Sequence, residues 1–277
     1  MHLNLPILHS IEALEKGNIK DTQNRPIMVH ASDLNYYYCK YHGHVGAANK
    51  LFKEYIVASF QQCWGFNQAP FRLIEVLAEH IPADLGIVRR SFDVPCFGLQ
   101  AIDDVGDLSK VNEDVLANSW KKTALKEDVL KLAFFDIWTC NEDRHTGNYN
   151  ILYKYLDGAY VVYPIDHEAC FNHGNFEHGL TEVTYQDNLI YSTFFSKLFN
   201  SNELKNQERL ENLKERFYLC SQSCKHNVNN YLPEIPNGWN IDIVQKEAEL
   251  RQYLLNDQWF DTCWNTFLEF LQYFTNE

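Results

Sequence analysis

The sequence has few features of proteins that bind nucleic acids or cross membranes. Its 277 residues carry a formal net charge of −13, and no run of Lys and Arg is longer than two. Because nucleic-acid phosphates are bound by basic surfaces, this charge balance argues against a nucleic-acid partner. No apolar run reaches the roughly 20 residues of a membrane span, and the start, MHLNLPILHSIEALE, lacks the basic region of a signal peptide. We therefore expect a cytoplasmic protein with no membrane contact.

Cysteines are present, but their spacing is not that of a disulfide framework. The eight cysteines are scattered, mostly within apolar stretches, which is typical of reduced thiols in a core. Only Cys220, Cys224 and His226 lie close together in sequence. No second ligand pair lies near them, so one helical face with two buried thiols is favoured over a zinc site.

The pattern of apolar residues changes along the chain. Short strand-like segments dominate the first hundred residues, interrupted by one helical stretch, ANKLFKEYIVASFQQCW. Helical periodicity dominates from about Val115 onward. We predict an α+β fold with a strand-rich domain at residues 1–104 and a helical domain at 105–277, joined near the acidic segment 102–107. The strand-like segments are PILHSIEAL, RPIMVHAS, YYYCKY, PFRLIEVLA and PCFGLQAI.

One polar segment, NEDRHTGNYN at residues 141–150, directly follows the apolar run LAFFDIWTC. Asp143 and Asn148 are five positions apart within it. In phosphoryl transfer, one carboxylate orients the attacking hydroxyl, and an amide oxygen one loop turn away helps to hold Mg²⁺ against the phosphates. The same two residues could instead cap turns. Likewise, Arg144 and His145 could pair with nearby acids on a solvated loop.

A second carboxylate is expected to approach this loop. The segments ILYKYL and AYVVYPID read as two strands joined at Asp157 and Gly158, a pair favoured in tight hairpins. The hairpin would return Asp166 to the loop that holds Asn148. A carboxylate that emerges beside a core needs a partner or a metal ion, so Asp166 is a candidate metal ligand.

Two charged residues of the first domain fit the same chemistry. Lys40 lies at the end of the strand-like YYYCKY, and Glu54 falls on the helix that follows. A strand Lys contacts nucleotide phosphates in this arrangement, and a helix Glu positions it. A simpler interpretation makes both of them surface residues. The segment EKGNIKDTQNRP, with Gly17, could cover phosphates through backbone N–H groups, although it lacks a G-x-G-x-x-G pattern.

Taken together, these residues resemble the HipA-like kinases. The loop of that family reads D-x-x-x-x-N-x-D-R/x-H-x-x-N, and its metal-binding Asp follows a short hairpin. The likeness covers residues from about 15 to 175, and the loop is also similar, more distantly, to the D-R-x-x-x-N loop of phosphatidylinositol kinases. The residues that match the loop are Asp136, Asn141, Asp143, Arg144, His145 and Asn148.

The resemblance implies a two-lobed protein-kinase-like fold, a strand-rich N-lobe and a helical C-lobe, and a role for each matching residue. Asp143 would be the catalytic base, with His145 and Lys40 as further catalytic residues. Asn148 and Asp166 would bind Mg²⁺. The segment 97–102 would be the hinge that faces adenine. Residues that would contact ATP, directly or through the metal, are Lys40, Glu54, Gly17, Gln100, Ala101, Asn148 and Asp166.

Members of the family phosphorylate proteins on Ser or Thr, several act as bacterial toxins, and some phosphorylate a Ser of their own phosphate loop. Here the loop between Gly17 and Pro26 contains Thr22 but no Ser. There is no room before Pro6 for the extra N-terminal subdomain of the long toxins, so the chain looks like the compact branch. We expect an ATP- and Mg²⁺-dependent Ser/Thr kinase with a protein substrate and a possible antitoxin or regulatory partner.

Two other function classes remain open. A metallohydrolase could use a cluster of His and carboxylate ligands, which suits Zn, Mn or Fe, although no helical H-E-x-x-H pair is present. A pseudokinase would bind nucleotide or a partner without transfer, and the glycine-poor phosphate loop favours it mildly. The candidate ligands of the metallohydrolase are Asp143, His145, Asp166 and His167, together with His173 or His178.

Overall fold

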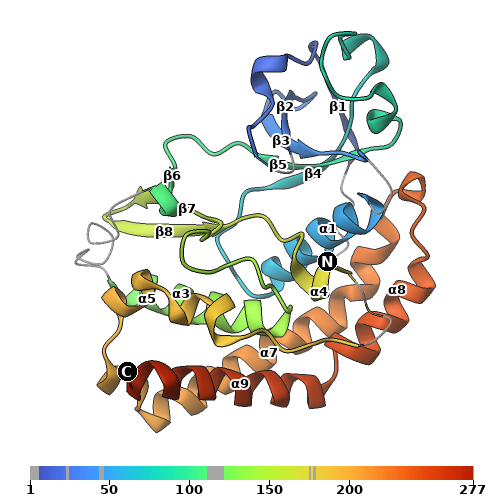
Figure 1. The fold of residues 1–277 in the computed structure, drawn as a ribbon. Coiled ribbons are helices and arrows are strands. Elements are labelled where there is room, and N and C mark those ends of the chain that lie inside the picture. Colours follow the sequence, from blue (N-terminus) through green and yellow to red (C-terminus); the bar gives the residue numbers. More distant parts are fainter. Residues whose placement is uncertain are drawn as a thin grey trace. The chain divides into compact units, whose positions relative to one another are not determined.

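The computed structural model describes residues 6–22, 25–43, 47–110, 122–174, 176 and 179–276. Contacts between residues group the chain into two compact units (Figure 1). The α+β class predicted from the sequence is confirmed. The first unit comprises Met1–Ser59, Ala69–Asp103 and Val228–Lys246, and the second comprises Phe60–Gln68, Asp104–Asn227 and Glu247–Glu277.

The first unit contains a five-stranded sheet in the order β1-β4-β5-β3-β2. Only the pair of β1 and β4 is parallel; the other neighbours are antiparallel. Side chains alternate along β3, where Tyr37 and Cys39 are buried while Tyr38 and Lys40 lie on the opposite, half-buried face. All five predicted strands are confirmed, although the first is short. The strands are β1 (Leu8–His9), β2 (Ile27–His30), β3 (Tyr36–Lys40), β4 (Phe71–Glu75) and β5 (Cys96–Gln100).

The predicted helix of the first domain is α1, Ala47–Cys63. Every residue from 51 to 61 is buried, which is typical of a helix that packs on all sides. The Tyr55 ring meets Phe71 of β4 edge to face, and its hydroxyl donates to the carbonyl oxygen of Tyr231 at 3.0 Å. Trp239 Nε1 donates to the carbonyl oxygen of Pro95 at 2.7 Å. These contacts attach residues 228–246 to the first unit.

The second unit is mainly helical and includes a three-stranded sheet, β6-β7-β8. Residues 129–138 of α3 are all buried. Phe134 of α3 stacks on Phe217 at 5.0 Å between ring centroids and meets Phe267 edge to face at 5.6 Å. The elements are β6 (Gly106–Asp107), α3 (Lys122–Trp138), β7 (Ile151–Leu156), β8 (Ala159–Pro164), α4 (Cys170–Gly174), α5 (Thr193–Leu198), α6 (Ser201–Leu204), the part of α7 (Gln207–Tyr231) up to Asn227, the part of α8 (Ile243–Glu249) from Glu247, the π-helical turn Leu250–Leu254 and α9 (Asp257–Asn276).

The hairpin of β7 and β8 has the turn predicted from the sequence. Asp157 and Gly158 both have positive φ, 48° and 78°, as a type I′ turn requires. The strands pair from Leu156 opposite Ala159 back to Ile151 opposite Pro164. The N–H of Ile165 then donates to the carbonyl oxygen of Asn150 at 2.9 Å. This bond extends the pairing by one step, so the chain after β8 runs beside the loop that precedes β7.

All eight cysteines are free, as the sequence predicted, and most of them are buried. Burial raises the pKa of the Cys96 thiol to about 12, and it also raises the pKa of Cys39, Cys140 and Cys224. Among the described residues, no group of three or more His, Cys, Asp and Glu side chains could hold a metal ion. Within the same part of the chain, no helix is both long and apolar enough to span a membrane.

Candidate active site

The polar segment 141–150 begins where the buried helix α3 ends. Thr139 Oγ1 donates to the carbonyl oxygen of Phe135 at 2.8 Å, and Cys140 has φ +50°, which stops the helix. The N–H of Asn141 then donates to the carbonyl oxygen of Asp136 at 2.8 Å. The loop therefore starts from residues that are fixed inside the core.

Asp143 is held by two amide side chains. Asn148 Nδ2 lies 2.8 Å from Asp143 Oδ1, and Asn150 Nδ2 lies 3.2 Å from Asp143 Oδ2. Backbone bonds in both directions between His145 and Asn148, at 3.2 and 3.0 Å, close the turn. Because Asn148 uses its amide nitrogen on Asp143, its Oδ1 is the atom that can coordinate a cation. Asn150 was not among the site residues predicted from the sequence.

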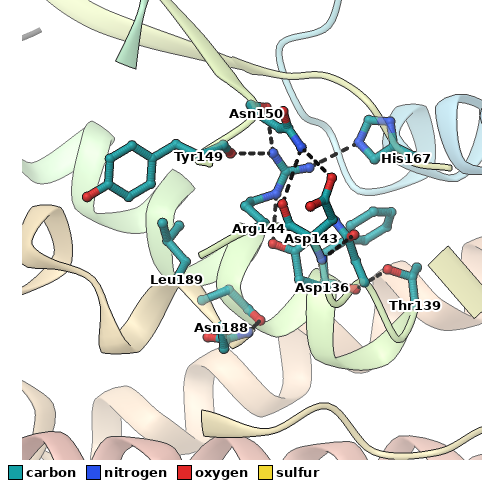
Figure 2. Close-up of polar contacts among 12 residues, drawn as sticks. Asp136, Thr139, Asp143, Arg144, Tyr149, Asn150, His167, Asn188 and Leu189 are labelled. Carbon is teal, nitrogen blue, oxygen red and sulfur yellow. Dashed lines mark hydrogen bonds and ion pairs between the residues drawn. The ribbon is translucent and has the colours of Figure 1, made fainter. Parts of the chain in front are cut away.

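Arg144 is fully buried at the centre of this arrangement (Figure 2). Its Nε donates to Asp136 Oδ2 at 2.9 Å, and Nη1 donates to the carbonyl oxygens of Tyr149 and Asn150. Its Nη2 lies 3.4 Å from the carbonyl oxygen of Ile165. The interpretation of Arg144 as a residue of a solvated loop is wrong, because its side chain is 0% exposed.

Asp136 supplies the counter-charge of this guanidinium. Burial raises the pKa of Asp136, while Arg144 and the amide of Asn141 oppose that rise by stabilising the carboxylate. Each carboxylate oxygen has a partner, since Asn141 Nδ2 donates to Oδ1 at 2.8 Å. A buried ion pair that is bonded in this way loses much of its stability when one partner is removed.

Asp166 and His167 follow β8 directly. Asp166 is half-buried with φ +56°, a left-handed conformation that Asp tolerates better than most residues. His167 is buried, and its Nε2 lies 2.8 Å from Gln61 Nε2 and 3.4 Å from Arg144 Nη2. Amide and guanidinium nitrogens can only donate, so His167 Nε2 accepts and the neutral ring carries its proton on Nδ1.

Lys40 and Glu54 form an ion pair in the first unit. Lys40 Nζ lies 2.6 Å from Glu54 Oε1, and the exposed fractions of the two side chains are 16% and 1%. The simpler interpretation of both as surface residues is therefore wrong. Tyr38, two residues before Lys40 on the same face of β3, carries the ammonium of Lys20 over its ring at 4.6 Å from the centroid.

The remaining candidates of the first unit have less specific surroundings. Gly17 lies in a 3₁₀ turn, Lys16–Asn18, and a Cβ there would meet no atom within 4 Å. The N–H of Gln100 donates to the carbonyl oxygen of Pro70 at 2.8 Å, and the N–H of Ala101 donates to that of Tyr36 at 2.7 Å. Both N–H groups of this part of the predicted hinge are thus bonded within the first unit.

The structure brings the candidates together in two groups. The second unit gathers Asp143, Asn148 and the hairpin end that carries Asp166, while the first unit pairs Lys40 with Glu54. One amide oxygen and one carboxylate fit Mg²⁺, which usually has few protein ligands and keeps waters and substrate phosphates in its shell. His178 and the side chain of His173 lie outside the described residues.

Comparison with known proteins identifies the family. A family model described as HipA-like kinase matches residues 11–259. The chain belongs to the HipA-like kinase family. It is therefore a kinase, a phosphotransferase, and membership implies ATP and usually a divalent metal ion. The resemblance seen in the sequence is confirmed.

A solved structure supports the fold of this HipA-like kinase. The crystal structure of a Helicobacter pylori proinflammatory kinase, CtkA, is similar with a TM-score of 0.54 and covers 97% of each chain. The two sequences are 12% identical, so the likeness concerns the fold alone. It confirms the kinase-like fold predicted from the sequence. No curated protein matches the chain.

Proposed function

We propose that this kinase transfers the γ-phosphate of ATP to a Ser or Thr hydroxyl of a protein, and that Asp143 orients that hydroxyl. The observation that supports the proposal best is the pair of amide bonds from Asn148 and Asn150 to the two carboxylate oxygens of Asp143. A carboxylate held in this way stays in one orientation, which is what positioning of an acceptor requires. The protein acceptor is suggested by the family resemblance of the sequence.

In this proposal, Asn148 Oδ1 and the Asp166 carboxylate hold Mg²⁺. When bound, the ion neutralises charge on the phosphates and orients them. The ammonium of Lys40, held by Glu54 at 2.6 Å, contacts the phosphates, and the loop around Gly17 covers them. The N–H groups of Gln100 and Ala101 are already hydrogen-bonded within the first unit. A backbone N–H that donates to adenine would therefore belong to a residue after Ala101.

His145 is the second candidate to accept the proton of the hydroxyl. Its Nδ1 lies 2.9 Å from the carbonyl oxygen of Thr146. A carbonyl oxygen can only accept, so Nδ1 donates this bond, and Nε2 is the ring nitrogen that could accept the proton. We assign orientation of the acceptor to Asp143 and include His145 in the catalytic set.

The alternatives find less support. A metallohydrolase would need several His and carboxylate ligands together, and no such group occurs among the described residues. His167 Nε2 is also already engaged by Gln61 and Arg144. A pseudokinase would not need the orientation of Asp143 by two amides. An antitoxin or regulatory partner, a toxin role and a cytoplasmic location stay predictions.

A labelling experiment tests this proposal. The full chain is incubated with γ-labelled ATP, Mg²⁺ and a cell lysate, and labelled proteins are hydrolysed to identify the phosphorylated amino acid. We expect phosphoserine or phosphothreonine with the wild type and with Asp261→Asn, a change of an exposed carboxylate. With Asp143→Asn, we expect little label beyond that of the lysate without added enzyme. Label found only on lipids or small molecules would contradict the protein acceptor.

A further inference from the structure

Arg144 connects the two chain segments that carry the proposed metal ligands. On one side, Nη1 bonds the carbonyl oxygens of Tyr149, at 2.8 Å, and Asn150, the two residues that follow Asn148. On the other side, Nη2 lies 3.4 Å from the carbonyl oxygen of Ile165, which precedes Asp166. Figure 2 shows the guanidinium with Tyr149 and Asn150 on one side and His167 on another.

The guanidinium is suited to this task because its donors have a fixed planar geometry. Three carbonyl oxygens accept from its two terminal nitrogens, so the plane of the group sets how far apart the two segments lie. The N–H of Ile165 bonds the carbonyl oxygen of Asn150 at 2.9 Å, and the same oxygen accepts from Arg144. A Lys ammonium is a point charge on a flexible stem and would not reproduce this set of bonds.

The orientation of Arg144 is itself fixed from two directions. Asp136 of the buried helix α3 accepts from Nε at 2.9 Å. His167 Nε2 lies 3.4 Å from Nη2 and is held by Gln61 Nε2 at 2.8 Å. Asp136 and His167 are buried, and all of these residues belong to the second unit. Arg144 therefore links the core of this unit to the residues on both sides of Asp166.

We propose that Arg144 is a positioning residue that sets the distance between Asn148 and Asp166 and thereby the affinity of the site for Mg²⁺. The inference rests on the proposed function, because it takes these two residues as the metal ligands. Arg144 acts through the backbone and touches neither substrate nor metal. Loss of such a supporting contact typically costs roughly 10–100-fold in metal affinity or activity.

The test compares Arg144→Lys with a matched control, Arg251→Lys. Arg251 Nε also pairs with a carboxylate of the second unit, Glu247, at 2.8 Å, and its Nη1 lies 3.4 Å from the carbonyl oxygen of Lys225. For each full-length variant, Mg²⁺ is titrated at fixed ATP, and both the rise in melting temperature and the rate of phosphate transfer are followed. Circular dichroism confirms that each variant is folded.

We expect Arg144→Lys to raise the Mg²⁺ concentration at half-maximal effect roughly 10–100-fold in both readouts, while the affinity for ATP without metal stays unchanged. Arg251→Lys should behave like the wild type. If Arg144→Lys does not fold, Gln61→Ala provides the test, because it removes the donor that holds His167 and should raise the Mg²⁺ requirement in the same direction.

The inference is overturned if Arg144→Lys folds and needs no more Mg²⁺ than the wild type; if it does not fold, the same result with Gln61→Ala overturns it. Either result would leave the proposed function intact. A wild type that shows Mg²⁺-dependent stabilisation by ATP but labels no protein would contradict the proposed acceptor. In that case the role of Arg144 is still tested by the melting temperature. The Mg²⁺ concentration that gives half of the rise in melting temperature is compared between Arg144→Lys and the wild type.

Discussion

The guanidinium of Arg144 and the carboxylate of Asp136 meet at 2.9 Å in the second unit, with both side chains 0% exposed. Charges are rarely buried unless they are paired, and here the pair joins helix α3 to the loop that carries Asp143. The stability of the core and the geometry of the proposed site therefore depend on the same contact.

Breaking this pair from one side should destabilise the protein strongly. Asp136→Ala leaves the Arg144 guanidinium buried without its counter-charge, and such changes cost about 3–5 kcal/mol of the free energy of unfolding. Urea denaturation followed by circular dichroism measures the loss. The double variant Asp136→Leu with Arg144→Met should be less destabilised than the sum of the losses in Asp136→Leu and Arg144→Met measured singly, because no charge stays behind. Additive losses would show that the two residues do not act as a pair.

Lys40 should contribute to nucleotide affinity and not to the fold of the second unit. A hydrogen bond to a charged group contributes about 1.5–3 kcal/mol, so Lys40→Met should raise the Kd of Mg·ATP roughly 10–100-fold. Calorimetric titration measures this change. Lys110→Met is the control, because Lys110 is largely exposed and pairs only with Asp107 among the contacts described. Equal affinity of Lys40→Met and the wild type would remove Lys40 from the site.

Thr22 is the hydroxyl residue of the predicted phosphate loop, and it is exposed. Phosphorylation would add roughly −1.5 to −2 charges where the ATP phosphates are expected, and repulsion would then exclude ATP. Mass spectrometry of the protein after incubation with ATP should find phosphate on Thr22, and Thr22→Val should prevent the accompanying loss of ATP binding. Phosphate found only at other positions would contradict this prediction.

Much of the fold could be predicted because its signals are local. The aromatic run YYYCKY predicts strand β3. The pair Asp157 and Gly158 predicts the hairpin turn, since few residue pairs adopt positive φ at both turn positions. The return of residues 228–246 to the first unit has no local signal. It depends on contacts such as Trp239 Nε1 to the carbonyl oxygen of Pro95, which joins residues far apart in the sequence.

Part of the candidate site could be predicted as well. Asp143 and Asn148 belong to one short loop, so their contact at 2.8 Å could be expected from the sequence; their roles in phosphate transfer stay predictions. The role of Arg144 could not be recognised, because a buried ion pair and a solvated one contain the same residue types. The contact between Gln61 and His167 joins residues on different elements, and neither residue stands out in the sequence.

The account predicts that Asp143 and Asp166 have different roles, although both are carboxylates of the same unit. In the proposed mechanism Asp143 orients the acceptor, an interaction made mainly as the reaction proceeds, so Asp143→Asn should leave Mg·ATP affinity nearly unchanged. In the same mechanism Asp166 holds the metal ion, so Asp166→Asn should weaken Mg·ATP binding and lower turnover together. Asn148→Ala should resemble Asp166→Asn in a milder form.

The most direct test is the rate of phosphate transfer by Asp143→Asn, measured on protein whose fold is confirmed by circular dichroism and whose Mg·ATP affinity is measured by calorimetry. The account predicts wild-type affinity with turnover lower by about 10²–10⁴-fold, the range lost when a positioned acid or base is removed. Full transfer activity in Asp143→Asn would contradict the assignment of residues 141–150 as the catalytic loop.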